Sequence, residues 1–381
     1  MKSTKISLKT IIYKPSAQRT TLAVATALAF ASTPKPSWPN PAGGQVVGGS
    51  ATISTPSASS MVIDQTSNKA IINWNTFSIG AGESVRFNQP SASSVVLNRV
   101  LGNTRSEIFG SLTANGQIFL VNPNGVLMAR GAEVSASGFL ASSLGITDGD
   151  FLAGRYSFTR GAAAGFVINE GSILTPGGHT ALLAPNIVNN GVIAARLGNV
   201  ALAAGDRVTL DFHGDGLLRV TVDEATLTTA IKNSGTITAD GGQVILTAKS
   251  ANALLDTVLN NVGVIRADTL VDRNGVIALE SSSGITSNTG SLLARGQNAA
   301  ETGGTVSVTS PNVLLTSTAV ADASGMAGGG NVFIGGNWRG QGPLANAQNT
   351  YVAQGAQLKA DARDIGNGGE IVVWANNATR Y

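Results

Sequence analysis

Short apolar runs separated by glycine-containing corners recur along the chain. From Val167 onward each unit has the pattern of a strand, a glycine corner and a second strand. The strands stay alike while the spacing of the corners varies, which is typical of a solenoid and not of a propeller. The copies lie at residues 173–183, 193–202, 237–246, 292–308, 320–334 and 358–373.

This pattern predicts an all-β fold, a right-handed parallel β-helix. A strand of a few residues cannot bury its apolar face alone, but coils stacked about 4.8 Å apart pair every backbone group and bury a column of Val, Ile, Leu and Ala. Parallel crossovers favour the right-handed path. Asparagines recur at the corners, and two interpretations stay open for them: stacked amide ladders or ordinary solvated turns. These residues are Asn186, Asn189, Asn190, Asn260 and Asn261.

The region before residue 98 is expected to cap the N-terminal end of the stack. An open sheet end exposes unpaired backbone groups and invites aggregation, so a solenoid needs such a cap. The capping strands are predicted at residues 51–54, 61–65, 70–74 and 84–87.

Three irregular segments are expected to decorate the stack. Residues 144–159 have the pattern of a hairpin packed outside it. A helical turn is expected only at 221–231 or 251–258, because glycine interrupts every other candidate helix.

The first 31 residues have the pattern of a secretory signal peptide. A basic leader without an acid precedes an apolar run at 22–30, and Ala29-Phe30-Ala31 fits a small-x-small site with cleavage after Ala31. The run is too short for a stable membrane anchor. Four prolines at residues 34–41 make residues 32–44 an extended linker. The leader cations are Lys2, Lys5, Lys9, Lys14 and Arg19.

Composition narrows the class of function. Charged residues make up 12% of the chain and aromatic residues 5%, both low for a globular enzyme, and the 47 glycines fit a fold with many turns. Without the five leader cations, 20 basic residues face 22 acidic ones, so nucleic-acid binding loses the basic field that it needs. The chain has no cysteine, so stability must come from burial and backbone pairing.

A tight turn at Asn122, Pro123, Asn124 and Gly125 stands between two apolar runs. Proline presets φ at the second position, asparagine tolerates a left-handed third position, and glycine suits the exit. The asparagine amides can also bond backbone groups left unpaired at a corner.

Several motifs accompany this turn in a fixed order, and together they closely resemble the secretion domain of two-partner secretion exoproteins, the filamentous haemagglutinin family of Gram-negative adhesins. The motifs are Gly-Gly-Ser-Ala-Thr-Ile at 48–53, Asp-Gln-Thr-Ser at 64–67, Ala-Ile-Ile-Asn-Trp-Asn-Thr-Phe-Ser-Ile-Gly at 70–80, Val-Arg-Phe-Asn-Gln-Pro at 85–90, Val-Leu-Asn-Arg-Val at 96–100 and Ile-Phe-Gly at 108–110.

The resemblance implies a function in export and adhesion. It identifies residues 45–255 as the secretion domain, with glycine-rich β-helix repeats continuing over 256–381, and the turn as the family's Asn-Pro-Asn-Gly secretion motif. It further implies that the chain passes through the periplasm and is recognised there by the POTRA domains of a TpsB-type outer-membrane β-barrel. The chain is then expected to fold at the cell surface, where its expected partners are host or bacterial glycans or proteins. Pro185-Asn186-Ile187 is a partial likeness of the family's second motif, Asn-Pro-Asn-Leu.

The turn has two interpretations, a structural corner and a site that the transporter reads directly, and we expect the structural contribution to dominate. In either case no catalytic residue, cofactor or metal is expected.

Two alternatives belong to other classes of protein. A carbohydrate-active β-helix enzyme would need two facing carboxylates. The nearest candidates are Asp206, Asp211, Asp215 and His213. The glycines next to them favour solvated corner residues over an active site. The other histidine, His179, lies beside a glycine pair and is expected to be exposed. The other alternative is a structural stalk with its active end elsewhere. Tyr381 directly follows the last repeat without a capping segment, so we expect either the N-terminal part of a longer protein or a short exported remnant.

Overall fold

The computed structural model describes residues 40–163, 165–212, 218–226, 229–251, 256–270 and 273–381. The predicted signal peptide, with its cleavage after Ala31, lies outside these residues. The end of the predicted linker packs on the first coil: Asn40 is buried, and Ala42 pairs with Thr76 through backbone hydrogen bonds of 3.0 and 3.3 Å. None of the helices in the described residues has the length and hydrophobicity that a membrane crossing requires.

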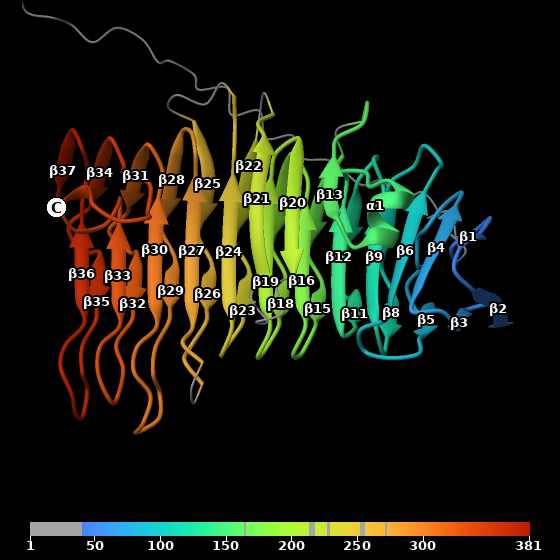
Figure 1. The fold of residues 1–381 in the computed structure, drawn as a ribbon, viewed down its shortest axis with the longest axis horizontal. Coiled ribbons are helices and arrows are strands. Elements are labelled where there is room, and N and C mark those ends of the chain that lie inside the picture. Colours follow the sequence, from blue (N-terminus) through green and yellow to red (C-terminus); the bar gives the residue numbers. More distant parts are fainter. Residues whose placement is uncertain (1–39, 164, 213–217, 227–228, 252–255, 271–272) are drawn as a thin grey trace, which may run out of the picture. The chain divides into compact units, whose positions relative to one another are not determined.

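The chain folds as the predicted right-handed parallel β-helix, with 53% strand and 3% helix. Each regular coil passes from the first sheet to the second, then to the third, and returns to the first one level along the stack (Figure 1). A coil is as short as 20 residues, which is the offset between His179 and its neighbour Asn199.

The first sheet has 12 strands in the described part of the chain. They are β1 (Gln45–Gly48), β4 (Lys69–Trp74), β6 (Val95–Val100), β9 (Gln117–Val121), β12 (Gly138–Ser142), β16 (His179–Leu183), β19 (Asn199–Ala204), β24 (Gln243–Ala248), β27 (Val276–Ser281), β30 (Thr305–Thr309), β33 (Asn331–Ile334) and β36 (Glu370–Val373).

The second sheet has ten strands among the described residues. They are β7 (Ser106–Ile108), β10 (Val126–Met128), β14 (Phe166–Asn169), β17 (Asn186–Asn189), β22 (Ala230–Asn233), β25 (Thr257–Asn261), β28 (Ile285–Asn288), β31 (Asn312–Leu315), β34 (Asn349–Val352) and β37 (Ala378–Arg380).

The third sheet has 12 described strands, and its first two form part of the cap. They are β2 (Ala51–Ser57), β3 (Ser60–Gln65), β5 (Ser84–Asn88), β8 (Ser111–Ala114), β11 (Glu133–Ser135), β15 (Ser172–Leu174), β18 (Val192–Ala194), β23 (Thr236–Thr238), β26 (Val264–Arg266), β29 (Ser291–Leu293), β32 (Val320–Asp322) and β35 (Gln357–Lys359).

The repeated apolar runs fall in register, as the sequence predicts. In the third sheet a continuous column of buried side chains runs through five successive strands, all with 0% exposed area. Burying such a side chain contributes about 1.5–3 kcal/mol, and the stack repeats this in every coil. The column consists of Ile173, Ile193, Ile237, Ile265 and Leu292.

Antiparallel strands cap the N-terminal end of the stack, which confirms the predicted cap. β1 pairs with β4, and β2 pairs with β3, so the parallel ladders end against strands of the opposite direction. Further parallel coils cannot add to this end without displacing them.

The predicted side element at residues 144–159 packs outside the main stack, but it is not a hairpin. It forms the helix α1 (Asp148–Ala153) and the strand β13 (Tyr156–Thr159). Thr147 caps the helix by accepting from the backbone N–H of Asp150, and Gly154 ends it with φ of +74°. These local caps permit a short helix that apolar periodicity does not reveal.

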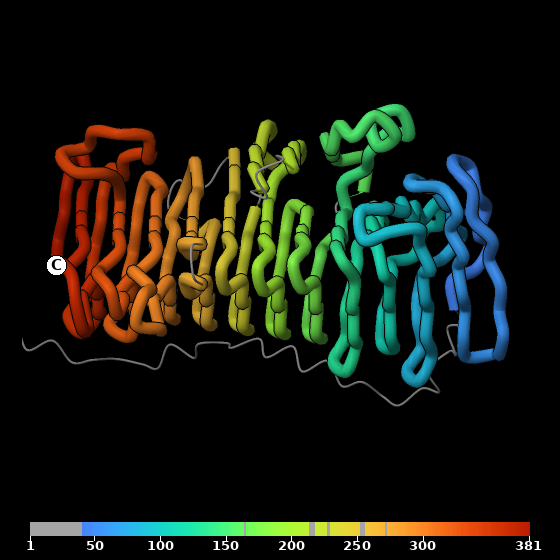
Figure 2. The backbone as a smooth tube through the Cα atoms, turned by 60° about the horizontal axis from the view of Figure 1, so that its bottom comes forward, coloured from blue at the N-terminus to red at the C-terminus, as the bar shows by residue number. Residues whose placement is uncertain are grey.

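β13 continues into an antiparallel side sheet with β20 (Arg207–Phe212) and β21 (Leu218–Glu224). The prediction of a helical turn at 221–231 is therefore wrong where the structure describes it, because β21 and β22 occupy most of this segment. Of the other segment predicted to form a helical turn, 251–258, residues 252–255 lie outside the described residues. Figure 2 shows α1 and the side sheet standing off the main stack.

A second apolar core lies between these side elements and the outer face of the first sheet. Its centre is aromatic: the ring of Phe119 packs edge-on against Phe151 of α1 and Tyr156 of β13, at 5.9 and 5.3 Å between centroids. Lys69 holds the end of α1 by donating to the carbonyls of Phe151 and Leu152. The first sheet is thus buried on both faces over this stretch.

Five buried asparagines form an amide ladder at the corner between the second and third sheets. Each side-chain amide donates to the carbonyl oxygen of the next, at 2.7–2.8 Å, and all five have 0% exposed area. Asn189 and Asn261 confirm the ladder interpretation, whereas Asn186, Asn190 and Asn260 lie outside it. The ladder runs through Asn169, Asn189, Asn233, Asn261 and Asn288.

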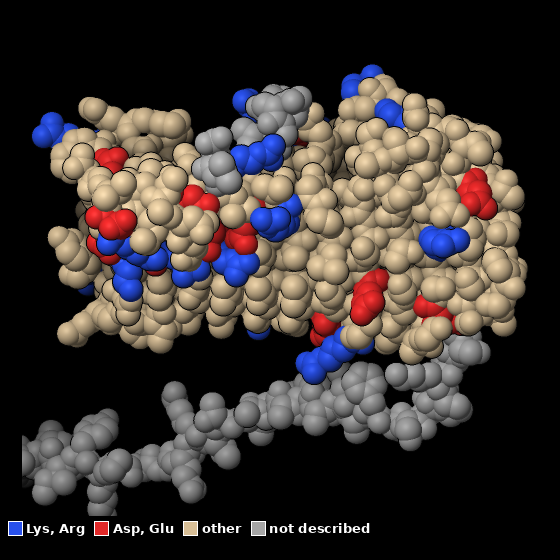
Figure 3. Space-filling model, turned by 90° about the horizontal axis from the view of Figure 1, so that it is seen from below, with Lys and Arg blue, Asp and Glu red and all other residues tan. Residues whose placement is uncertain are grey.

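Ion pairs follow the corner between the third and first sheets. Arg266 donates to both carboxylate oxygens of Asp240, and Arg295 does the same one coil on with Asp268. Figure 3 shows acidic and basic side chains gathered in a band on this side of the stack. The carboxylates of Asp240 and Asp268 are only 14% and 9% exposed, so these pairs are partly buried, and the bonds from Arg266 and Arg295 satisfy carboxylates that would be costly to bury alone.

The amide ladder predicts a marked asymmetry between two asparagine substitutions. Asn233→Ala leaves the amide of Asn189 and the carbonyl of Asn261 without partners in a buried corner. Each orphaned group costs about 1–3 kcal/mol, so we expect a loss of roughly 2–4 kcal/mol in the free energy of unfolding, measured by urea denaturation.

Asn349→Ala is the matched control, because Asn349 bridges Asn312 and Asn377 in an exposed ladder where water replaces the lost bonds. We expect it to cost less than about 1 kcal/mol. Equal losses in the two variants would contradict a stabilising role for the buried ladder.

Candidate functional site

The Asn-Pro-Asn-Gly turn connects β9 to β10, at the corner between the first and second sheets. The backbone N–H of Gly125 donates to the carbonyl of Asn122 at 2.9 Å and closes the turn. Gly125 has φ of +108°, whereas Asn124 is not among the described residues with positive φ. The tolerance of asparagine for a left-handed conformation is therefore not used at the third position, and the positive φ belongs to the exit glycine, which adopts it without steric cost.

Asn122 is the buried centre of the turn, with 0% exposed area. Its amide Nδ2 donates to the carbonyl of Thr104 and to Oγ of Ser106, both at 3.0 Å. Its Oδ1 accepts from the backbone N–H of Asn124 at 2.9 Å, and its own backbone N–H donates to Ser142 of the next coil. Every polar group of this side chain is satisfied, as burial requires.

Asn124 and Pro123 extend the same clamp and are half-buried. The amide of Asn124 donates to the carbonyl of Gly102 at 2.9 Å, on one side of the turn. The carbonyl of Pro123 accepts from the backbone N–H of Gly165 at 3.1 Å, on the other side. The turn therefore joins the coil before it and the coil after it.

Close backbone packing explains the glycine that faces the turn. A Cβ atom on Gly165 would lie 2.3 Å from the backbone nitrogen of Gly125, and one on Gly125 would lie 2.7 Å from the carbonyl oxygen of Phe166. Larger residues would push the two coils apart. The site thus includes residues outside the motif, which the motif alone does not reveal: Gly102, Thr104, Ser106 and Gly165.

A small cavity of about 240 Å³ adjoins the turn through Thr104. Ser78, Arg105 and Glu107 complete its lining, and Nε of Arg105 donates to the Glu107 carboxylate at 2.7 Å. The cavity thus carries charges of both signs and hydroxyl groups.

The partial second motif lies at the corresponding corner. Asn186 pairs in register with Phe166, which follows Gly165 in the coil next to the turn. Pro185 and Asn186 thus occupy the corner between the first and second sheets, as the Asn-Pro-Asn-Gly turn does.

The carboxylates proposed for an enzyme do not converge in the described structure. Oδ1 of Asp206 pairs with Arg160 at 3.0 Å, and Asp211 lies on β20 opposite Arg219. His213 and Asp215 lie outside the described residues. Within those residues no three His, Asp or Glu side chains gather as a metal site would require.

His179 is half-buried, so its expected exposure is wrong. Its ring packs 4.9 Å from that of Phe212 in the side sheet, and Nδ1 lies 3.1 Å from the amide of Asn199. Burial lowers the pKa of His179 below its ordinary value, which favours the neutral ring at pH 7.

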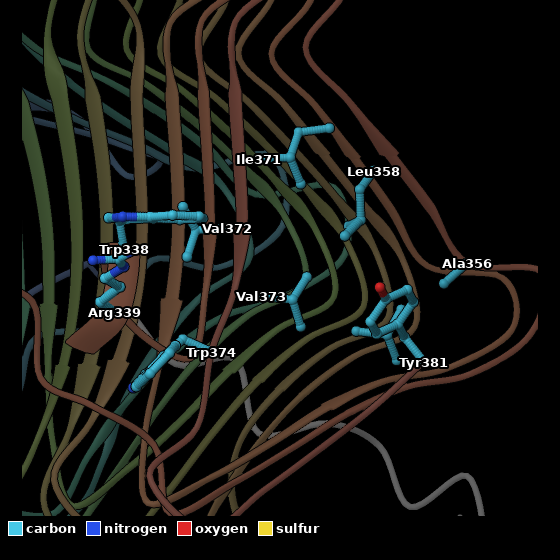
Figure 4. A pocket seen from close by; sticks show the side chains of 10 residues that line it. Trp338, Arg339, Ala356, Leu358, Ile371, Val372, Val373, Trp374 and Tyr381 are labelled. Atoms are coloured by element: carbon cyan, nitrogen blue, oxygen red, sulfur yellow. The ribbon is translucent and has the colours of Figure 1, made fainter.

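A cavity of about 690 Å³ lies at the C-terminal end of the stack, far along it from the turn. Its walls are apolar and aromatic, including Trp338, Trp374 and Tyr381, with Arg339 as the charged side chain among its lining residues (Figure 4). No carboxylate is among these lining residues, so the acid–base pair of a glycoside hydrolase is not found in this cavity.

Comparisons with known proteins agree with this architecture. A heme/hemopexin-binding protein of Haemophilus influenzae is 33% identical over 249 residues, which are 63% of this chain and 27% of that protein. This chain thus spans about a quarter of the length of the curated relatives it matches. The solved HMW1 secretion domain from Haemophilus influenzae superposes with a TM-score of 0.80 at 30% identity, over 89% of this chain and 88% of that one.

The family model described as the TPS secretion domain matches residues 39–294. These residues include the N-terminal cap, the Asn-Pro-Asn-Gly turn, the side sheet and the amide ladder, and they are well over half of the chain. The chain therefore belongs to the TPS secretion-domain family of two-partner secretion exoproteins.

Proposed function

We propose that this chain is exported across the outer membrane of a Gram-negative bacterium by a dedicated TpsB-type β-barrel and acts at the cell surface as an adhesin. In this proposal residues 1–31 direct the chain to the periplasm, and residues 32–44 are a linker. Residues 45–255 are recognised by the periplasmic POTRA domains of the barrel, and residues 256–381 continue the β-helix. Family membership supports the export step, and surface glycans or proteins are the proposed adhesion partners.

Family membership is the observation that carries the proposal of export, and the clamp formed by the turn supports the role that we propose for Asn122. Asn122 is inaccessible in the folded chain, yet it joins the coils on either side, so we infer that it contributes to export mainly by stabilising early coils. Each coil that forms outside the membrane docks on the previous one and disfavours return of the chain. Folding of this kind would supply direction without nucleotide hydrolysis.

Export should depend on a transporter partner. We expect the chain, expressed in a Gram-negative host with a cognate TpsB-type barrel, to reach the medium or the cell surface, and to remain in the periplasm when the barrel gene is absent. Immunoblotting of the fractions measures this. Equal secretion in the two strains would contradict the proposal.

Asn122→Ala should reduce both stability and export. The variant orphans the carbonyl of Thr104 and the backbone N–H of Asn124, so we expect a loss of roughly 2–4 kcal/mol. Urea denaturation and the secreted fraction are measured on the same variant.

Asn233→Ala serves as the matched control, because it removes a buried corner amide from a coil distant in sequence from the turn. If the turn acts through folding, the two variants lose export in proportion to their loss of stability. Lost export of Asn122→Ala with unchanged stability would instead show that the transporter reads the turn directly.

A further inference from the structure

A second groove lies on the outer face of the first sheet, beyond the end of the side sheet. Its volume is about 320 Å³. Val222 of β21 lies on one side and residues 343–345 on the other, while β24, β27 and β30 form the floor. In Figure 2 the side sheet and the loop that follows β33 both stand off the stack and flank these strands.

The floor is a row of polar side chains in a column that holds both apolar and polar residues in earlier coils. Val121, Leu183 and Ala203 occupy this column in earlier coils, where the side elements bury them. The same column continues, in register, through Thr247, Glu280 and Thr309. Asn73, Arg99 and Ser142 also belong to the column, so the groove is distinguished by its cover: none of Thr247, Glu280 and Thr309 belongs to the second apolar core.

Glu280 is half-buried and has no hydrogen-bond or ion-pair partner among the described residues. Burial raises the pKa of its carboxyl above the ordinary value. Lys249 lines the same groove but donates to the carbonyl of Asp223 at 3.0 Å, and Oγ of Ser281 is bonded to the carbonyl of Ser283. Lys249 and Ser281 therefore have other partners, and the side chains in register with Glu280 are the neutral Thr247 and Thr309.

A partly desolvated carboxylate without a partner is unfavourable, and a cation brought by a ligand would relieve this cost. Val222, Pro343 and Leu344 supply apolar walls that suit the aliphatic stem of a long basic side chain. The described lining residues include no aromatic ring on which a sugar could stack.

We propose that this groove binds an arginine or lysine side chain of a partner protein, with Glu280 as the counter-ion, the hydroxyls of Thr247 and Thr309 beside the cationic head, and the apolar walls around the stem. The site is separate from the Asn-Pro-Asn-Gly turn and does not depend on the export mechanism.

The test uses the purified chain and the capped peptide Gly-Leu-Arg-Leu-Gly at millimolar concentration, observed by saturation-transfer difference NMR. A matched peptide has citrulline in place of arginine, which keeps the shape and removes the charge. We expect saturation of the arginine side-chain protons, and at least tenfold weaker binding of the citrulline peptide.

Substitutions locate the effect. Glu280→Gln should weaken binding of the arginine peptide at least tenfold, whereas Glu133→Gln, which makes the same change at an exposed position on β11, should leave it unchanged. Thr247→Lys, which places an ammonium group beside Glu280 in register, should also abolish binding and should raise the melting temperature.

The proposal would be overturned by equal binding of the two peptides, by unchanged binding in Glu280→Gln, or by no saturation transfer to the arginine peptide in the wild-type chain. Binding that Glu133→Gln weakens as much as Glu280→Gln would show non-specific charge attraction and would overturn it as well.

Discussion

The structure depends on the pairing of each coil with the next. Strands of three to seven residues have little stability alone, but stacking them gives each backbone group a partner and each inward side chain an apolar environment. The corners must then repeat closely, because a change in one coil displaces the backbone of its neighbours. The amide ladder and the Asn-Pro-Asn-Gly turn both meet this requirement by bonding from one coil to another.

The amide ladder and the Asn-Pro-Asn-Gly turn stabilise their corners in different ways. In the ladder, identical side chains recur at one corner, so each amide both donates and accepts along the stack. At the turn, the neighbouring coils have no matching asparagine, and Asn122 instead satisfies the carbonyl of Thr104 and the hydroxyl of Ser106. A buried corner that cannot use the ladder thus depends on one residue.

The sequence was sufficient to predict the elements that repeat. The column from Ile173 to Leu292 and the glycine corners follow from periodicity alone, and so does the N-terminal cap. The helix α1 escaped prediction because its caps at Thr147 and Gly154 are local signals within only six helical residues. The partners of Asn122 lie about 20 residues upstream and depend on the coil register. The surroundings of Glu280 include residues 343–345, more than 60 positions away, so no local pattern could reveal that groove.

The interlocking of coils through buried amides can be tested directly by NMR on selectively asparagine-labelled chain. We expect the side-chain amide protons of Asn189, Asn233 and Asn261 to exchange slowly with solvent and to show cross-relaxation from each residue to the next. Rapid exchange of these protons, at the rate of the exposed Asn349 amide, would contradict the stacked corner on which the fold and its proposed role in export rest.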